Sequence, residues 1–177
     1  MCIRDRITIM DLKDYIRSIK DYPKKGILFR DITTLIKNET AFEESINQIV
    51  ERSKKFKVDK IAAIESRGFV FASAVSYILK KPFIMLRKKN KLPADVHSVD
   101  FQLEYGTATI EVHKDSISEN DSVLIIDDLI ATGGTAEAAA KLIEISKGKV
   151  AAFIFVINLF DLGGCENLLK NGYKLSL

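Results

Sequence analysis

The residues that could do chemistry gather between Ser122 and Thr135. Residues 123–126 are four consecutive apolar residues, three of them β-branched, which is typical of a strand buried on both faces. Two acids, Asp127 and Asp128, end this expected strand, and a loop of small residues follows them. Residues 136–145 are rich in strong helix formers and carry an apolar stripe, so we expect a helix there.

The loop between the expected strand and helix has the composition of an anion site. Backbone N–H groups and hydroxyls at a helix start can bind a phosphate, and the helix dipole adds partial positive charge there. Gly133 and Gly134 would let the backbone adopt positive φ and approach a ligand closely. The candidate phosphate-binding residues are Ala131, Thr132, Gly133, Gly134 and Thr135.

The two acids beside this loop restrict the ligand. Asp127 and Asp128 would repel a bare phosphate, whereas they would attract the hydroxyls of a sugar or a Mg²⁺ that the ligand carries. A phosphorylated sugar therefore fits better than phosphate alone. The loop has neither the Gly-Lys-Ser/Thr of a nucleotide P-loop nor the G-x-G-x-x-G of a dinucleotide-binding turn. The alternative is a structural strand–loop–helix connection with two solvated acids.

The hydrophobic pattern predicts the elements that would position this loop. Apolar stripes indicate helices at residues 11–19, 40–56 and 69–79. Short apolar runs indicate extended segments at residues 27–33, 60–64, 83–86, 108–113 and 149–157. Strands that alternate with helices favour an α/β fold with an open, mostly parallel twisted sheet flanked by helices.

A second polar turn, Glu-Ser-Arg-Gly, follows the strand expected at residues 60–64. Ligands of open α/β sheets usually bind at the carboxyl ends of the strands, so Arg67 would lie at that edge. Its guanidinium could hold the oxygens of a diphosphate in a bidentate manner. The alternative is a solvated arginine in a turn.

Four cations lie within the five residues 87–91, ahead of a polar stretch that contains Pro93. A solvated charged loop is the simplest interpretation. A nucleic-acid site is a poorer one, because aromatic residues do not interleave with the cations and the net charge is only +3. The functional alternative is a mobile lid at residues 87–98, which would neutralise an anionic leaving group and exclude water.

The composition favours one globular domain in a reducing compartment. The chain has 177 residues, of which 47% are apolar and 29% charged. Cys2 and Cys165 form no CxxC pair, and His97 and His113 do not have the spacing of a zinc site, so we expect a cytoplasmic protein. No apolar run approaches the roughly 20 residues of a membrane span, and we see no signal peptide.

The stretch from Ser122 to Thr135 resembles the phosphoribosyl pyrophosphate (PRPP) loop of type I phosphoribosyltransferases. The resemblance implies the fold of that family, with the loop on the 5-phosphate and with Asp127 and Asp128 on the ribose hydroxyls. Mg²⁺ would be carried by PRPP, without direct protein ligands. The Glu-Ser-Arg-Gly turn and the basic stretch also resemble the family, and they imply pyrophosphate contacts from Ser66, Arg67, Arg87 and Lys91.

Two further stretches resemble the adenine-specific members of this family. Residues 21–33 are similar to their N-terminal hood, which implies adenine contacts from Leu28, Phe29 and Arg30. The aromatic ring would stack on the base, and main-chain groups would read its edge. A 6-oxopurine would leave such buried groups unpaired. The sequence Leu-Glu-Tyr-Gly-Thr implies that Glu104 is the general acid/base near the purine imidazole.

The resemblance covers about residues 11–177 and implies transfer of the phosphoribosyl group from PRPP to adenine, giving AMP, by a homodimer. Residues 1–9 look foreign, so we expect a single domain at 10–177, with a hood at about 10–36 and a core at about 40–177. The alternatives are a transferase for another base, such as xanthine, and a PRPP-sensing regulator without catalysis. The positions that depart from the family pattern are Asn90, Ala94 and Asn158.

Overall fold

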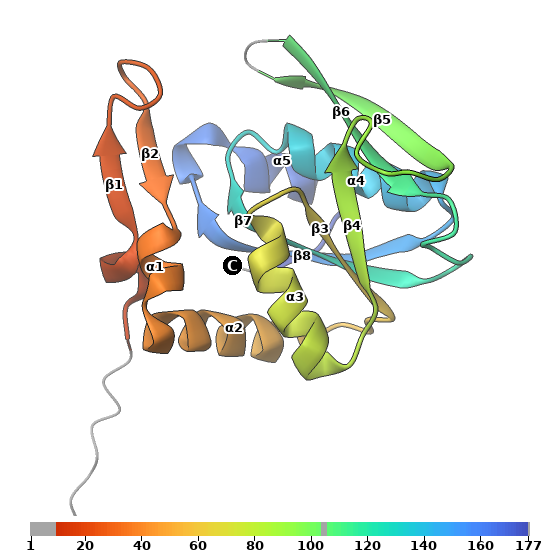
Figure 1. The fold of residues 1–177 in the computed structure, drawn as a ribbon, viewed down its shortest axis with the longest axis horizontal. Coiled ribbons are helices and arrows are strands. Elements are labelled where there is room, and N and C mark those ends of the chain that lie inside the picture. The colour runs from red at the N-terminus through yellow and green to blue at the C-terminus, as the bar shows by residue number, and fades with distance from the viewer. Residues whose placement is uncertain (1–9, 104–105, 177) are drawn as a thin grey trace, which may run out of the picture. The chain divides into compact units, whose positions relative to one another are not determined.

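The computed structural model describes residues 10–103 and 106–176, and Figure 1 shows their helices and strands. The chain divides after Gln48 into two compact units. No helix in this described part of the chain is long and apolar enough to cross a membrane. The predicted boundary between a hood and a core, at about residues 36–40, stays a prediction.

The first unit is built around a two-stranded antiparallel sheet in which Arg17 lies opposite Asp31. Its elements are η1 (Leu12–Tyr15), β1 (Arg17–Lys20), β2 (Leu28–Asp31), α1 (Thr33–Lys37) and the greater part of α2 (Glu39–Ser53). The helix predicted at residues 11–19 is wrong, since one 3-10 turn ends at Tyr15 and the chain continues as β1. Pairing with β2 outweighs the helical spacing of a few apolar residues.

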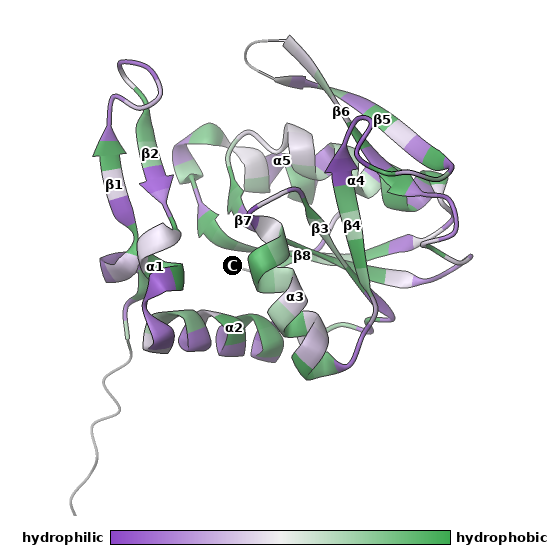
Figure 2. Cartoon of the chain, in the orientation of Figure 1, coloured by the Kyte–Doolittle hydropathy of each residue, from purple (hydrophilic) through white to green (hydrophobic). Residues whose placement is uncertain are grey.

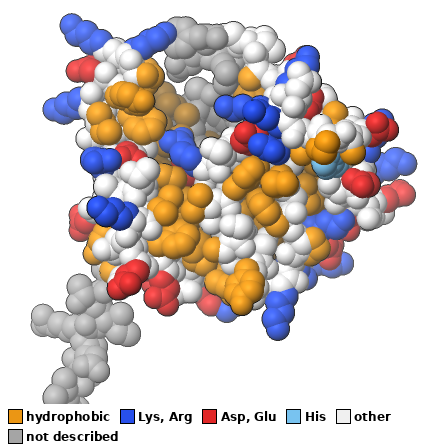
Figure 3. Space-filling model, in the orientation of Figure 1, with side chains coloured by type: hydrophobic (Ala, Val, Ile, Leu, Met, Phe, Trp, Pro, Cys, Tyr) orange, Lys and Arg blue, Asp and Glu red, His pale blue; other side chains and the backbone are white. Residues whose placement is uncertain are grey.

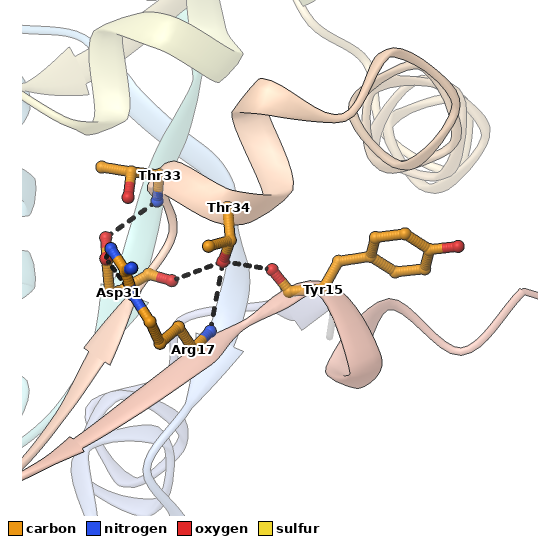
Figure 4. A network of polar contacts seen from close by, with 5 residues as sticks. All are labelled: Tyr15, Arg17, Asp31, Thr33 and Thr34. Atoms are coloured by element: carbon orange, nitrogen blue, oxygen red, sulfur yellow. Dashed lines mark hydrogen bonds and ion pairs between the residues drawn. The ribbon is translucent and has the colours of Figure 1, made fainter.

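A polar network fixes the two strands of this unit to the start of α1 (Figure 4). Asp31 accepts hydrogen bonds from Thr33 N at 2.9 Å and from Arg17 Nε at 3.0 Å. Thr34 Oγ1 donates to Tyr15 O at 2.6 Å and accepts from Arg17 N at 3.2 Å, which holds the chain in its extended course. The hydrogen bonds from Thr33, followed by those from Arg17, lower the pKa of Asp31 to about 2.

The second unit contains a seven-stranded sheet in the order β5-β6-β4-β3-β7-β8-β9. Five neighbouring strands, in the order β4-β3-β7-β8-β9, pair in parallel. The β5–β6 hairpin is antiparallel and joins β4 in antiparallel pairing. The predicted open, mostly parallel sheet is therefore confirmed. The strands are β3 (Lys60–Ile64), β4 (Phe83–Lys88), β5 (Val96–Leu103), β6 (Gly106–His113), β7 (Ser122–Ile130), β8 (Lys149–Asn158) and β9 (Leu175–Ser176).

Helices cover both faces of this sheet. Figure 1 shows α3 (Gly68–Leu79) in front of the sheet and α4 (Gly134–Ile145) behind it, beside α5 (Gly164–Lys170). Side chains of β7 and β8 such as Ile125 and Phe153 share one buried cluster with α4. The central strands β3 and β4 are hydrophobic along most of their length, and β4 becomes hydrophilic at its carboxyl end (Figure 2). This change of character places polar groups at the edge where ligands bind. The remaining 3-10 turn is η2 (Phe160–Leu162).

The basic stretch is more ordered than the sequence predicts. We expected a loop over residues 87–98, but β4 continues to Lys88 and β5 begins at Val96. The strand expected at residues 108–113 begins at Gly106 and pairs along its whole length with β5. Val99 and Phe101 of β5 pack against the core cluster, and this burial stabilises a strand where we expected a lid. The turn between the two strands is shortened to residues 89–95.

Candidate active site

A cavity of about 400 Å³ lies at the carboxyl ends of β3 and β7, entirely within the second unit. This is the edge of an open α/β sheet at which ligands usually bind, and the volume suits a small metabolite. The cavity brings together most of the predicted ribose, phosphate and pyrophosphate residues. Its lining includes Ser66, Arg67, Asp127, Asp128, Ala131, Thr132, Gly133, Gly134 and Thr135.

The phosphate loop, residues 131–135, leads directly from β7 into α4. Gly133 has a φ of 93°, a left-handed conformation that glycine adopts without strain, and the helix begins at Gly134. Positive φ is therefore confirmed for Gly133, but it is wrong for Gly134, which is helical. The first N–H groups of an α-helix have no partner within the helix, so α4 presents donors and a positive dipole end to this cavity.

The phosphate loop is held from behind by the start of α5. Gly164 N donates to Ala131 O at 3.1 Å, and Asn167 Nδ2 donates to Thr132 O at 3.3 Å. A Cβ at Gly164 would lie 2.3 Å from Ala131 O and 2.9 Å from Gly133 N, so only glycine allows this close approach. These two hydrogen bonds hold the carbonyl groups of Ala131 and Thr132 against α5.

The acid pair lies within the last four residues of β7, so the strand continues beyond the end that we predicted. Asp128 is buried, and its N–H donates to Asp127 Oδ1 at 2.9 Å. Burial, followed by repulsion from Asp128, raises the pKa of Asp127 well above its ordinary value. Burial also raises the pKa of Asp128, and the neighbouring Arg67 opposes that rise. Carboxyl groups so placed can pair with the hydroxyls of a sugar.

Arg67 joins the turn after β3 to the acid pair. Its Nε lies 2.9 Å from Asp128 Oδ2, and the two groups form an ion pair between a half-exposed guanidinium and a buried carboxylate. The alignment is not that of a hydrogen bond, and Asp128 Oδ2 has no hydrogen-bond partner. Gly68, which follows Arg67, packs so closely on β7 that a Cβ there would lie 2.7 Å from Asp127 Oδ1. The peptide bond between Glu65 and Ser66 is cis.

Glu65 also lines the cavity, and it binds the end of β4. Its carboxylate accepts hydrogen bonds from Lys88 N at 3.0 Å and from Arg87 Nε at 3.2 Å. The hydrogen bond from Lys88, followed by that from Arg87, lowers the pKa of Glu65 below its ordinary value. Through Glu65, the predicted pyrophosphate residue Arg87 is attached to the rim of the cavity.

The basic turn after β4 contains Asn90, one of the three departures from the family pattern. Asn90 has a φ of 63°, in the left-handed region that asparagine tolerates better than most residues, so it can replace a glycine there. Lys91 N donates to Lys88 O at 3.2 Å and closes the turn. Asn90 N donates to Glu111 Oε2 at 3.0 Å, and this buried acid holds the turn against β6. Ala94 does not have positive φ, so this position does not require glycine.

The roles predicted for Glu104 and for the three hood residues stay predictions. Glu104 lies outside the described residues. Leu28, Phe29 and Arg30 belong to β2 in the first unit, where Phe29 makes an edge contact with Tyr22 at 5.2 Å between ring centroids. The departure at Asn158 leaves a buried Oδ1 without a hydrogen-bond partner, at the end of β8.

Three residues that support the site were not predicted from the sequence. Lys88 lines the cavity, although we named only Arg87 and Lys91 in that stretch. Glu65 precedes the predicted Ser66, and its acid type at a strand end was the available signal. Gly164 lies about 30 residues after the phosphate loop, and nothing local to that loop indicates their contact.

Known proteins share this arrangement. The family model "Phosphoribosyl transferase domain" matches residues 31–171. The adenine phosphoribosyltransferase of Pelagibacter ubique is 82% identical over 94% of this chain and 95% of its own length. The crystal structure of adenine phosphoribosyltransferase from Thermoanaerobacter pseudethanolicus has 45% identity and a TM-score of 0.89, over 93% of this chain and 95% of that one.

A structure with bound ligands is also similar. The Saccharomyces cerevisiae adenine phosphoribosyltransferase, complexed with an imino-altritol bisphosphate and adenine, has 32% identity and a TM-score of 0.86. The match covers 93% of this chain and 94% of that chain. The cavity, the fold and these similarities agree, and the chain belongs to the phosphoribosyltransferase family, within the group of adenine phosphoribosyltransferases.

Proposed function

We propose that this protein transfers the 5-phosphoribosyl group from PRPP to adenine, which gives AMP and pyrophosphate in purine salvage. The observation that carries the proposal is that a helix-start anion loop, an acid pair and Arg67 meet in one cavity. Relatives named adenine phosphoribosyltransferase, one of them 82% identical, support the choice of adenine as acceptor.

The cavity offers a separate group for each part of PRPP. The 5-phosphate would bind the N–H groups and hydroxyls of residues 131–135 at the start of α4. Asp127 and Asp128 would accept hydrogen bonds from the ribose hydroxyls. Arg67, aided by Ser66, would bind the diphosphate, because a guanidinium matches phosphate oxygens with its fork of donors. Arg67 would then exchange its contact with Asp128 for one with the diphosphate.

The reaction is a displacement at the anomeric carbon. The bond to the diphosphate breaks as the bond to adenine N9 forms, and positive charge develops on the ribose ring. The carboxylates of the acid pair would stabilise that positive charge. The cations Arg67, Arg87 and Lys91 would stabilise the departing pyrophosphate. Arg87 is held by Glu65 before the reaction, so little reorganisation of this cation is needed as charge develops.

Mg²⁺ is part of this proposal as a partner of PRPP. The cavity fits it, because Mg²⁺ keeps several waters when it binds substrate phosphates, and the carboxyl groups of Asp127 and Asp128 attract such a cation without being its direct ligands. When bound with PRPP, Mg²⁺ would neutralise part of the charge on the diphosphate. We propose that Asp127 and Asp128 bind the ribose hydroxyls and come close to the ion only in this indirect way.

Adenine would be recognised by the predicted hood residues Leu28, Phe29 and Arg30. Phe29 would stack on the base, and main-chain groups of Leu28 and Arg30 would pair with its edge. A backbone carbonyl accepts from the exocyclic amine, and a backbone N–H donates to a ring nitrogen. Glu104 would act as the general acid/base that takes the proton lost when adenine becomes substituted at N9.

The protein would act as a cytoplasmic homodimer. Large apolar side chains are exposed on α3 and β4, among them Tyr77, Ile78 and Met85, and Figure 3 shows hydrophobic groups gathered over these elements. Self-association would remove such a surface from water. Sedimentation equilibrium should give twice the chain mass of 19.9 kDa, and a mass of one chain would refute the dimer.

The base specificity can be tested directly. Purified protein is incubated with PRPP, Mg²⁺ and one base at a time, and nucleotide formation is followed by chromatography. We expect AMP from adenine and at most trace product from hypoxanthine, guanine or xanthine, because a 6-oxopurine reverses the donor and acceptor pattern. Conversion of xanthine or hypoxanthine without AMP formation would contradict the proposed substrate. Binding of PRPP without any turnover would favour a regulator.

A further inference from the structure

Glu65 makes several polar contacts at the rim of the cavity, yet the mechanism above does not use it. Its Oε2 accepts from both Lys88 N at 3.0 Å and Arg87 Nε at 3.2 Å, and its Oε1 accepts from Arg87 Nη2 at 3.4 Å. Its own N–H donates to Leu86 O at 2.9 Å. Glu65 therefore binds the end of β4 through both its main chain and its side chain.

These contacts restrict the guanidinium of Arg87. An arginine side chain has many rotamers, and the fork of Nε and Nη2 on one carboxylate selects a single orientation. The remaining group, Nη1, lies 3.5 Å from Lys91 O and so reaches the basic turn. The Arg87 side chain is about 29% exposed, so solvent and a ligand can still reach it. Glu65 thus fixes the place from which Arg87 can meet an anion.

A negative group beside an anion site could instead weaken binding by repulsion. Here the carboxylate oxygens are already engaged by the end of β4, and the side chain of Glu65 is only 15% exposed. Its charge is also paired with the charge of Arg87, which leaves the pair close to neutral toward the cavity. Orientation of the arginine should therefore outweigh repulsion by the acid.

We propose that Glu65 is a positioning residue for pyrophosphate, which acts through Arg87 and makes no contact with the substrate itself. The inference rests on the proposed function, because it assumes that the cavity binds the diphosphate of PRPP. It differs from the proposed role of Arg67, which comes from the same turn but pairs with Asp128.

A double-mutant cycle on Glu65 and Arg87 tests the inference. Isothermal titration calorimetry would measure binding of Mg²⁺-pyrophosphate to the wild type, to Glu65→Ala, to Arg87→Ala and to the double variant. We expect Glu65→Ala to weaken binding about tenfold, as for loss of a hydrogen bond to a charged group. In the Arg87→Ala background the same change should cause no further loss of affinity, because the residue through which Glu65 acts is gone.

Matched variants separate positioning from general damage. Glu65→Gln keeps the shape and one acceptor oxygen, so pyrophosphate binding should fall less than in Glu65→Ala. Glu119→Ala, at an exposed acid of the same unit, should change nothing. AMP binding, which relies on residues 131–135, should stay within about twofold in Glu65→Ala, since the contacts of Glu65 lie at the end of β4. Equal losses for AMP and pyrophosphate would show general damage and overturn the inference.

Other outcomes also overturn the inference, and they do so independently of the proposed function. Tighter pyrophosphate binding in Glu65→Ala would show that repulsion dominates. Additive losses in the cycle would show that Glu65 does not act through Arg87. Either result could occur in an enzyme that still makes AMP. By contrast, a wild-type protein that binds neither pyrophosphate nor PRPP would refute the proposed function and, with it, the role of Glu65.

Discussion

Replacement of Gly164 by alanine should damage the phosphate loop from behind without touching the substrate. The added Cβ would lie 2.3 Å from Ala131 O, whereas ordinary contact begins at 3.4 Å, so the loop would have to move by about 1 Å. A misplacement of about 1 Å at a binding site can cost on the order of 10²-fold in rate. We therefore expect Gly164→Ala to lower kcat/KM for PRPP by about that factor, with a parallel loss of AMP affinity.

The control for this prediction is Gly172→Ala. Gly172 also has glycine-specific geometry, with a φ of 84°, but no atom lies within 4 Å of a Cβ built there. Both variants should lose stability, by about 1–3 kcal/mol from overpacking at Gly164 and about 1–2 kcal/mol from backbone strain at Gly172. Only Gly164→Ala should lose AMP binding in calorimetry. Wild-type AMP affinity in folded Gly164→Ala would refute the contact between α5 and the loop as a requirement for phosphate binding.

Three further predictions concern acids. Because the folded pKa of Asp31 is about 2, below the ordinary 3.8, its contribution to stability is complete at neutral pH and is lost as pH falls from about 4 toward 2. Asp31→Asn should lower the urea midpoint at neutral pH and flatten its fall in acid; an unchanged profile would contradict this. Asp128→Asn should weaken PRPP binding by roughly tenfold or more, and calorimetry that gives the wild-type Kd would remove it from the ribose site. Glu104→Ala should cut turnover by about a hundredfold or more while PRPP still binds, and unchanged turnover would exclude Glu104 from catalysis.

The parts of the fold that depend on local pattern were predictable from the sequence. The central strands consist of buried apolar runs, and β3 has the predicted bounds. The errors lie where tertiary pairing decides. Residues 11–19 have helical spacing, but only a 3-10 turn forms at Leu12–Tyr15, and the chain then continues as β1 because β2 and Asp31 pair with it. The alternation of apolar and polar residues from Val99 to Leu103 was a strand signal that the charged run before it obscured.

The same distinction between local pattern and tertiary contact applies to the residues of the site. The acid pair, the phosphate loop and the Ser66–Arg67 turn are each contiguous in sequence, so their chemistry could be predicted, and the sheet brings them to one cavity. Gly164 and Glu65 act by contacts between distant elements. A close approach of two backbones, or a carboxylate shared by Arg87 and Lys88, is set by the packing of strands and helices and has no local sequence pattern.

A crystal structure of the protein with AMP would test most directly that this cavity is the site of phosphoribosyl transfer. We expect the 5′-phosphate on the N–H groups of residues 131–135 and the ribose hydroxyls on Asp127 and Asp128. The adenine ring should stack on Phe29. We expect Arg67 to leave Asp128 only when a diphosphate is also present. A phosphate bound elsewhere, or a ribose without contact to the acid pair, would contradict it.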